Sequence, residues 1–362
     1  PVEPYIGGFT SFMQVTPLGN EHTFVPDWSV HVIAHELHHA IQIRYGTSVS
    51  GEPGNYAYNG WLYEQTSTYM ENVIFPASYH FLVMMGNCNI TSPLTYPEIS
   101  IDSSVDIYQY RSALWQKFLV EAYGDSTINR LIWEDFGLET ATGNPVNMFP
   151  IYESALQTVT DGVTTLGAAY QDYALWRYFT GSRSRPGEFF MQAASYCTAN
   201  LLAIEETSIT IPSEKGGARL VKLLPYETNL VLASSAYDNL LVQHISFSEE
   251  DEILMSSIEV NGEELFFQLT NPSGDNHALL ITSKYTAEPS EEIEFILSNT
   301  IPFIEGDITG DSMVNIQDII VQINIILHQI DPTDYQWLAA DLDENNVVDV
   351  LDVILLVNLI LG

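Results

Sequence analysis

The spacing of apolar positions in residues 1–202 predicts a domain made mainly of helices. Apolar residues recur every three or four positions in the segments 27–45, 61–74, 108–123, 126–137 and 166–178. This is the spacing of helices that bury one face. Gly124 follows the third segment and is expected to end its helix. Ahead of these segments, "YIGGFTSFMQV" has the composition of a β-strand.

The pattern changes near residue 203, where helical spacing gives way to short segments rich in β-branched residues. Turn sequences such as "NPSGDN" separate them. The segments are "TSITIPSE", "ARLVKLL", "TNLVLASSA", "LLVQHISFS", "ILMSSIEV", "EELFFQLT", "HALLITSKY" and "EIEFILSN". Short strands at regular intervals predict an all-β sandwich domain over residues 203–302.

The last segment contains an internal repeat, in which an Asp-rich loop leads into an apolar helix. "GDITGDSMVNIQDIIVQINIIL" and "ADLDENNVVDVLDVILLVNLIL" align without gaps. A 12-residue calcium loop supplies ligands from positions 1, 3, 5, 7, 9 and 12, and position 7 uses its backbone carbonyl. These positions hold Asp307, Thr309, Asp311, Met313, Asn315 and Asp318 in the first loop, and Asp341, Asp343, Asn345, Val347, Asp349 and Asp352 in the second. The repeat therefore predicts two bound Ca²⁺ ions.

The two loops differ from those of EF-hand proteins. Position 12 is Asp in both, and no helix is expected before either loop. With the tandem layout over residues 306–362, this resembles a type I dockerin. The resemblance implies that the module binds a cohesin-like partner and attaches the chain to a scaffold or surface; self-association is the alternative. Ser312 stands where the loop usually has Gly, so we expect weaker calcium binding by the first loop.

The composition of the chain limits which classes of partner it can bind and which cellular compartment it suits. The chain has 47 Asp and Glu against 11 Lys and Arg, a formal net charge of −36, which repels nucleic acid and anionic membranes. No apolar run is long enough to span a membrane. Cys88 and Cys197 form either a disulfide or two buried thiols. The abrupt start at Pro1 is expected of a mature or truncated form of a longer precursor. We therefore expect a secreted protein, extracellular or at the cell surface.

The segment "IAHELHHAIQ" has the spacing of a zinc site on a helix. His35 and His39 lie one turn apart, so both imidazoles can reach one ion, and Glu36 is rotated towards a water molecule. The apolar neighbours of these residues predict that the helix is largely buried. Glu64, on a second helix, is a candidate third ligand. Glu71, two turns after Glu64, is a support for one of the histidines, a spare ligand or a solvated carboxylate. The alternative for the whole segment is a polar turn whose histidines cap or pair.

Four segments together resemble secreted gluzincin metalloproteases of the myxobacterial type: "HELHHAIQ", "WLYEQTSTYMEN", "YQYRSALWQKFLVEAYG" and "YALWRYFTG". The resemblance implies that His35, His39 and Glu64 bind zinc. Glu36 would then be the general base for a zinc-activated water that hydrolyses a peptide or protein substrate. Two departures stand out. The family usually has Glu-Gly-x-Ala where this chain has Glu64-Gln65-Thr66-Ser67, and it has more sheet before the HExxH helix.

An oxyanion formed during hydrolysis needs a hydrogen-bond donor, and Tyr108, Tyr110 or Arg111 can supply it. We take Tyr110 as the catalytic candidate. The predicted fold class is multidomain α+β. It has a mainly helical zincin-like domain (1–202), an all-β sandwich (203–302) and a small α calcium-loop, dockerin-like module (303–362). The alternative function is a non-catalytic extracellular structural, adhesive or self-assembling protein that retains a degenerate or structural zinc site.

Overall fold

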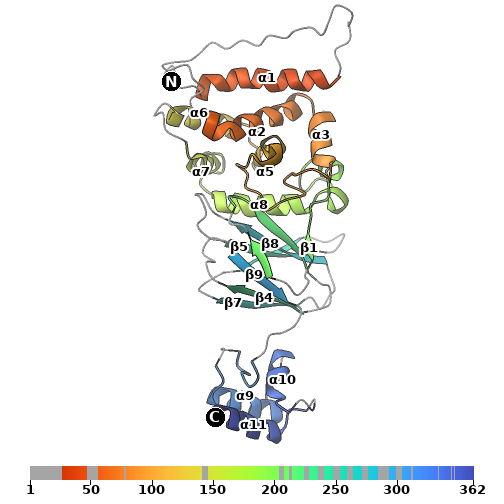
Figure 1. Cartoon of the computed structure of the whole chain (residues 1–362), viewed down its shortest axis with the longest axis vertical. Coiled ribbons are helices and arrows are strands. Elements are labelled where there is room, and N and C mark those ends of the chain that lie inside the picture. Colours follow the sequence, from red (N-terminus) through yellow and green to blue (C-terminus); the bar gives the residue numbers. More distant parts are fainter. Residues whose placement is uncertain are drawn as a thin grey trace, which may run out of the picture. The chain divides into compact units, whose positions relative to one another are not determined.

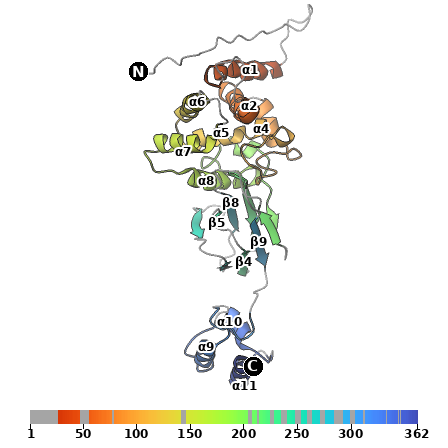
Figure 2. The ribbon, with the colours of Figure 1, turned by 60° about the vertical axis from the view of Figure 1, so that its left-hand side comes forward.

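The chain divides into two compact units, residues 1–297 and 298–362 (Figures 1 and 2). The computed structural model describes residues 27–46, 56–76, 79–140, 146–203, 208–211, 214–223, 228–234, 240–247, 253–258, 264–270, 276–283, 293–298, 304–310, 313–332, 334–343, 345 and 347–362. The predicted strand in "YIGGFTSFMQV" lies outside these residues. Within them, no helix has the length and apolar character needed to cross a membrane.

Helices form the first part of unit 1. They are α1 (Asp27–Gly46), α2 (Tyr56–Ile74), α3 (Tyr79–Gly86), α4 (Tyr108–Arg111), α5 (Ala113–Tyr123), α6 (Thr127–Thr140), α7 (Met148–Val159) and α8 (Leu166–Tyr178). Local chemistry fixes several ends. Thr165 accepts a hydrogen bond from the backbone N–H of Ala168 at the start of α8. Gly124 ends α5 in a left-handed conformation, φ 67°, as predicted. The segment predicted as one helix over 108–123 is divided between α4 and α5 at Ser112.

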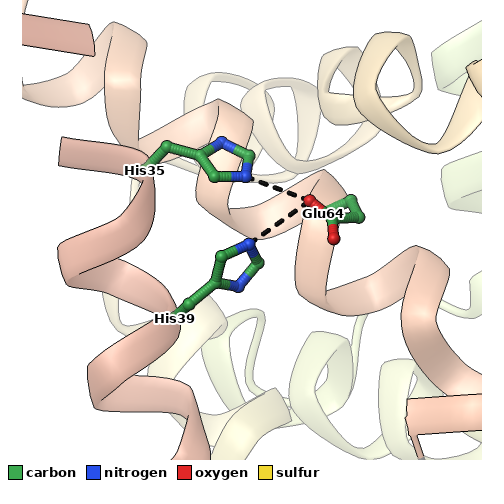
Figure 3. Close-up of side chains that lie close together, drawn as sticks. All are labelled: His35, His39 and Glu64. Carbon is green, nitrogen blue, oxygen red and sulfur yellow. Dashed lines mark hydrogen bonds and ion pairs between the residues drawn. The ribbon is translucent and has the colours of Figure 1, made fainter. Parts of the chain in front are cut away.

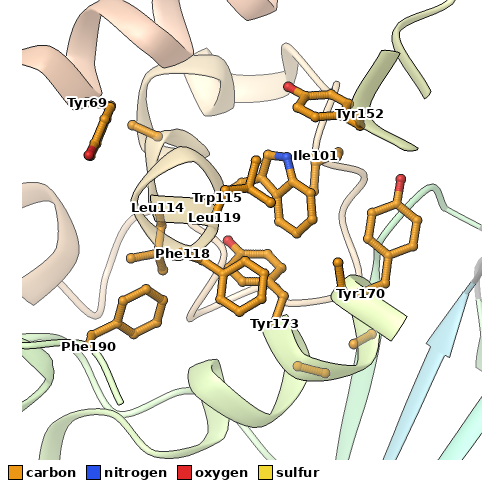
Figure 4. Packing of buried hydrophobic residues seen from close by; sticks show 14 of the residues in the cluster. Tyr69, Ile101, Leu114, Trp115, Phe118, Leu119, Tyr152, Tyr170, Tyr173 and Phe190 are labelled. Atoms are coloured by element: carbon orange, nitrogen blue, oxygen red, sulfur yellow. The ribbon is translucent and has the colours of Figure 1, made fainter. Parts of the chain in front are cut away.

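The core of the helical part is built around Trp115 of α5 (Figure 4). Its ring centroid lies 5.4 Å from that of Phe118, 5.9 Å from Tyr152 and 5.1 Å from Tyr173. The same cluster continues into the strands through buried side chains such as Leu280. Helix α8 lies between the other helices and the strands (Figure 1). The helical and β parts of unit 1 therefore share one hydrophobic core.

Each of the eight segments predicted as strands in residues 203–302 contains one in the structure. These strands are β2 (Ser208–Ile211), β3 (Ala218–Lys222), β4 (Thr228–Ser234), β5 (Leu240–Phe247), β6 (Leu254–Ile258), β7 (Glu264–Thr270), β8 (Asn276–Ser283) and β9 (Ile293–Ser298), preceded by β1 (Leu202–Ala203). They form a sheet of order β1-β3-β8-β5-β6 and a sheet of order β2-β9-β4-β7. Among the pairings whose register is described, that of β1 with β3 is parallel. The pairings of β2 with β9, β3 with β8, β4 with β7, β5 with β6 and β5 with β8 are antiparallel. Packing of the two sheets into a sandwich stays a prediction.

A disulfide joins Cys88 to Cys197 across 109 residues. It links the turn after α3 to the segment that follows η3 (Ala193–Ser195). The backbone N–H of Cys197 also donates to the carbonyl of Met85 at 2.7 Å. The bond therefore closes a long loop within the helical part of unit 1, consistent with an oxidising compartment.

Helix α1 is less buried than its apolar composition predicts. Ala34 and His35 are buried, whereas Leu37 and Ile41 are each 48% exposed. The face of α1 that carries His35 packs against α2, and α1 lies at the edge of the helical part in both views (Figures 1 and 2). The prediction of a largely buried helix was wrong because apolar residues were counted on every face of α1.

Unit 2 contains α9 (Ile316–Ile326), α10 (Asp334–Ala340) and α11 (Val350–Leu361). Its small core contains Ile308, Ile325, Ala339, Ala340, Val348 and Leu356. The expectation that no helix precedes either loop was wrong for the second, because α10 ends directly before Asp341. Ala339 and Ala340 are fully buried, and Gln322 of α9 donates to the carbonyl of Ala340 at 2.8 Å. Packing against α9 therefore holds this short helix.

Candidate metal centres

His35 and His39 of α1 point towards Glu64 of α2 (Figure 3). Their Nε2 atoms lie 3.0 Å and 3.3 Å from the same oxygen, Glu64 Oε2. One ligand atom from each of the three residues falls within a group less than 4.8 Å across. The structure thus brings together the three side chains that the HExxH spacing and the downstream glutamate predicted as zinc ligands.

The donor set fits a zinc ion in both chemistry and spacing. Zinc in proteins takes imidazole nitrogens and carboxylate oxygens at about 2.0–2.1 Å in tetrahedral geometry. Two ligand atoms of such a tetrahedron stand about 3.3–3.4 Å apart, from the bond lengths and the tetrahedral angle. The distances of 3.0 and 3.3 Å to Glu64 are close to that edge length. Little rearrangement of these side chains is needed to bind an ion.

A second set of hydrogen bonds fixes the orientation of both imidazoles. Nδ1 of His35 donates to Glu71 Oε1 at 2.8 Å, and Nδ1 of His39 bonds Gln42 Oε1 at 2.7 Å. The amide of Gln42 in turn donates to the carbonyl of Tyr63 at 3.0 Å and to the hydroxyl of Thr66 at 2.7 Å. Engaging Nδ1 leaves Nε2 of each ring to face Glu64, as metal-binding histidines require.

Gln65, Thr66 and Ser67, where the chain departs from the gluzincin pattern, contribute to the hydrogen bonds around the two histidines and α2. The hydroxyl of Ser67 lies 3.2 Å from Nδ1 of His39, and Thr66 accepts the bond from Gln42. Gln65 is fully buried and donates to the carbonyl of Ile101 and to the hydroxyl of Ser112. These polar side chains therefore connect α2 both to the face of α1 that carries His35 and His39 and to the start of α5.

His80 of α3 is a residue that the sequence analysis did not assign to the site. Its Nδ1 lies 2.6 Å from Glu71 Oε2, so Glu71 bridges His35 and His80. The side chain of Glu71 is 2% exposed and that of His80 is 48% exposed. The structure thus favours the supporting role for Glu71 over the solvated one. Nothing in the spacing of His80 along the chain links it to α1 or α2.

The carboxylates of Glu64 and Glu71 favour a positive charge on His35, which lies between them. Burial opposes protonation of His35, but its hydrogen bonds to Glu64 and Glu71 outweigh burial and raise its pKa to about 9. Burial acts against ionisation of Glu71 as well, yet its bonds to His35 and His80 hold its pKa below the usual range. The pKa of His38 shifts in the opposite direction: burial, followed by the charges of the neighbouring His39 and His35, lowers it to about 4. A cation is therefore favoured at His35 and disfavoured at His38.

Tyr110, one of the two catalytic candidates, interacts with Glu64 of the cluster and with Glu36, the other candidate. Glu36 is exposed. The ring of Tyr110 stacks on His35 at 5.8 Å between centroids, and its hydroxyl bonds Glu64. Burial, followed by the charge of Glu64 and its hydrogen bond, raises the pKa of Tyr110 to about 12. The other two candidates for oxyanion stabilisation, Tyr108 and Arg111, have other partners. The hydroxyl of Tyr108 lies 3.4 Å from the carbonyl of Ile99. Arg111 Nη1 donates to the backbone carbonyls of Thr91 and Asp106.

In the first calcium loop, the carboxylates at positions 1 and 12 come together. Asp307 and Asp318 are buried, and the hydroxyl of Thr309 lies 3.3 Å from the first and 2.9 Å from the second. Asn315 caps the N-terminus of α9 and accepts a hydrogen bond from the backbone N–H of Gln317. The carbonyl of Met313 lies 3.4 Å from the Asn315 amide. Asp311 lies outside the described residues.

The second loop gathers three carboxylates, those of Asp341, Asp343 and Asp352, within 4.8 Å of one another. The backbone N–H of Asn345 lies 3.1 Å from Asp341 Oδ1 and 3.2 Å from Asp343 Oδ1. Asp349 caps the N-terminus of α11, as Asn315 caps that of α9. The backbone N–H of Val347 donates to the side chain of Asn345. Three carboxylates at this separation repel one another unless a cation lies between them.

Two family models match separate parts of the chain. Residues 23–150 match a family of unknown function (DUF6055). The matched region contains His35, Glu36, His39 and Glu64. A search of curated proteins gave no match. Residues 305–361 match the dockerin type I domain, so the C-terminal unit carries a dockerin type I domain, which implies that its two loops bind Ca²⁺.

Proposed function

We propose that the helical part of unit 1 is a zinc metallopeptidase that the dockerin domain attaches to a scaffold. The observation that carries the proposal is the convergence of His35 and His39 on one oxygen of Glu64. Spacing along the chain brings two histidines onto one helix face, but only the fold adds a carboxylate from α2. The layout of HExxH with a glutamate on a second helix is that of a gluzincin.

The number of ligands supports a catalytic site over the alternative of a structural one. Structural zinc sites are closed by four protein ligands, whereas catalytic sites hold three and keep a position open. Within the described part of the chain, the metal-ligating group at this site has three members. The exposed Glu36 beside it fits a site that a substrate reaches from solvent.

The roles of the residues follow from their positions. His35, His39 and Glu64 would hold a zinc ion, which would supply Lewis-acid chemistry that acidifies water and polarises a carbonyl. Glu36 accepts the proton of the attacking water and passes it to the leaving amine. Tyr110 keeps its proton at neutral pH, because its pKa is about 12, and can donate it in a hydrogen bond to the oxyanion. Glu71 and Gln42 fix the orientation of the imidazoles of His35 and His39.

Peptide bonds are the proposed substrate because of the resemblance to secreted gluzincin metalloproteases. The match to a family of unknown function leaves the reaction open. The dockerin domain indicates attachment to a cohesin-bearing scaffold, and proteins with this domain are typically extracellular or at the cell surface. The substrate is therefore proposed to be a peptide or protein outside the cell.

Replacement of Glu36 tests the reaction without disturbing the fold, because its side chain is exposed. Glu36→Gln should keep zinc and lower peptide hydrolysis by about 100-fold or more, the contribution expected of a general base. The matched control is Glu139→Gln, an exposed glutamate of α6, which should hydrolyse as the parent does. Hydrolysis by zinc-loaded Glu36→Gln at the parental rate would refute the proposed role.

A further inference from the structure

The amine of Lys117 is buried within the helical part of unit 1, where it contacts an amide and a carboxylate. Nζ of Lys117, on α5, lies 2.8 Å from Oδ1 of Asn72 in the last turn of α2. It also lies 2.7 Å from Oε1 of Glu121, one turn further along α5. Lys117 and Asn72 are buried, and the side chain of Glu121 is 13% exposed. A primary amine, a carboxamide and a carboxylate therefore meet at one atom, largely out of water.

The amide of Asn72 presents its carbonyl group to this amine. Its Nδ2 donates to the carbonyl of Pro76 and to Oε1 of Gln192, each at 3.4 Å. These two acceptors orient Nδ2 and leave Oδ1 to face Nζ of Lys117. The carbonyl carbon is one C=O bond beyond Oδ1, so Nζ lies less than about 4 Å from it. Reacting atoms in near-attack geometry are about 3–3.5 Å apart, and a small shift of the lysine side chain reaches that distance.

Glu121 is placed to accept a proton from the amine. Its Oε1 faces Nζ, and its Oε2 accepts a hydrogen bond from the backbone N–H of Met191 at 3.2 Å. The ring of the fully buried Phe81 is centred 5.9 Å from Nζ. Burial disfavours charged groups relative to neutral ones, so it favours transfer of a proton from the ammonium of Lys117 to the carboxylate of Glu121. The transfer produces a neutral amine, which is the nucleophilic form of lysine.

We propose that Lys117 and Asn72 join in an intramolecular amide bond that ties α5 to α2. Nζ of the neutral amine attacks Cγ of Asn72 and forms the new C–N bond. The bond from Cγ to Nδ2 then breaks, and Nδ2 leaves as ammonia. Glu121 gives the departing nitrogen the proton that it took from Lys117, and accepts the surplus proton of the new C–N group. Ammonia takes up this last proton and leaves as ammonium, so that Glu121 ends as a carboxylate and no oxidant or cofactor is consumed.

The new bond would add a second covalent link to the helical part of unit 1. It would close a loop of 45 residues, and this loop contains Cys88, which is bonded to Cys197. Links of this kind constrain the unfolded chain and so favour the folded one. The proposal does not depend on a zinc ion, because Lys117, Asn72 and Glu121 are neither proposed ligands nor the proposed general base.

The mass of the full chain, unfolded and with its disulfide reduced, tests the bond directly. The folded parent should be lighter than its sequence mass by one molecule of ammonia. A proteolytic digest of it should contain a branched peptide that joins the segment around Asn72 to the segment around Lys117. Lys117→Arg keeps a positive charge and hydrogen-bond donors but has no primary amine, so it should have the full sequence mass.

Glu121→Gln tests the proton carrier, and Glu134→Gln is its matched control. Glu134 pairs with Arg130 at the same spacing of four residues on a helix, at 3.0 Å. Glu121→Gln should form the bond about 100-fold more slowly or not at all, the effect of losing a general base, and Glu134→Gln should be as light as the parent. Formation by Glu121→Gln at the parental rate would refute the reaction as written.

The parent decides the proposal even where a variant fails to fold. A folded parent that keeps its full sequence mass after prolonged incubation would overturn it. A lighter parent whose digest lacks the branched peptide would overturn it as well, because ring closure of Asn72 on its own backbone also releases ammonia.

Discussion

Replacing Glu71 with glutamine removes the charge behind His35 and keeps the shape of the side chain. Glu71 is buried and accepts from Nδ1 of His35 at 2.8 Å. A hydrogen bond to a charged group contributes about 1.5–3 kcal/mol, and one between neutral groups about 0.5–1.5 kcal/mol. The loss is therefore about 1–1.5 kcal/mol, which corresponds to roughly tenfold weaker zinc binding. This agrees with the effect of about 10- to 100-fold typical of residues that orient metal ligands.

Glu64→Gln should have a larger effect, because it removes an anionic ligand and not its support. Structural zinc sites with four ligands bind with about 10–16 kcal/mol, or about 3 kcal/mol per ligand. That share corresponds to roughly 100-fold or more in affinity. Competition of the full chain against a chromophoric zinc chelator at constant pH measures both variants, with circular dichroism as the check on folding.

His80→Gln is the control for the bridge, since it removes the other partner of Glu71. It should weaken zinc binding less than Glu71→Gln does, because the charge next to His35 remains. If Glu71→Gln lost as much zinc affinity as Glu64→Gln, or more, the assignment of ligand and support would be wrong.

Three further predictions concern pH, calcium and the disulfide. The pKa of His35 is raised from 6.5 to about 9 in the metal-free protein. Protonation of His35 therefore stabilises the folded metal-free protein fully below pH 6.5, and this stabilisation is lost as the pH rises through about 9. A zinc ion must displace this proton to bind His35. Calorimetry in buffers of different ionisation enthalpy should therefore show release of about one proton per zinc near neutral pH, and release of none would contradict this. Chelation of Ca²⁺ should loosen unit 2, and Asp352→Ala should weaken calcium binding more than Asp318→Ala does. Each of these two carboxylates accepts a hydrogen bond of 2.8 Å from the backbone N–H of the residue before its helix, so both substitutions remove the same kind of helix cap. Equal losses of calcium binding by calorimetry would refute the difference between the loops. Replacing Cys88 and Cys197 with serine opens a loop of 109 residues and should lower the free energy of unfolding by about 2–5 kcal/mol, whereas identical denaturant curves would show that the bond does not constrain the unfolded chain.

The strands and the calcium repeat were predictable because each is a local pattern. β-branched content and the turn sequences between segments identified the positions of β2 to β9, and the gapless repeat placed α9 and α11 directly after their loops. Packing decided the elements that were missed. The short helix α10 is held by its buried Ala339 and Ala340 against α9, and α3 and α7 were not predicted at all.

The sequence defined the metal-binding face of α1 more completely than its surroundings. His35, His39 and Glu64 follow from helical spacing and the motif, and the fold brings them together. Glu71 lies two turns after Glu64 on the same face, so sequence alone could not separate ligand from support. His80 joins through the tertiary contact of α3 with Glu71, and no spacing rule carries that information.

We propose that His35, His39 and Glu64 form one zinc site. Metal analysis of the full chain after exhaustive dialysis tests it most directly, with His39→Ala analysed in parallel. The parent should retain about one zinc per chain, and His39→Ala should lose nearly all of it, since removing one ligand leaves two. A parent without zinc after loading, or a folded His39→Ala variant with as much zinc as the parent, would contradict the account.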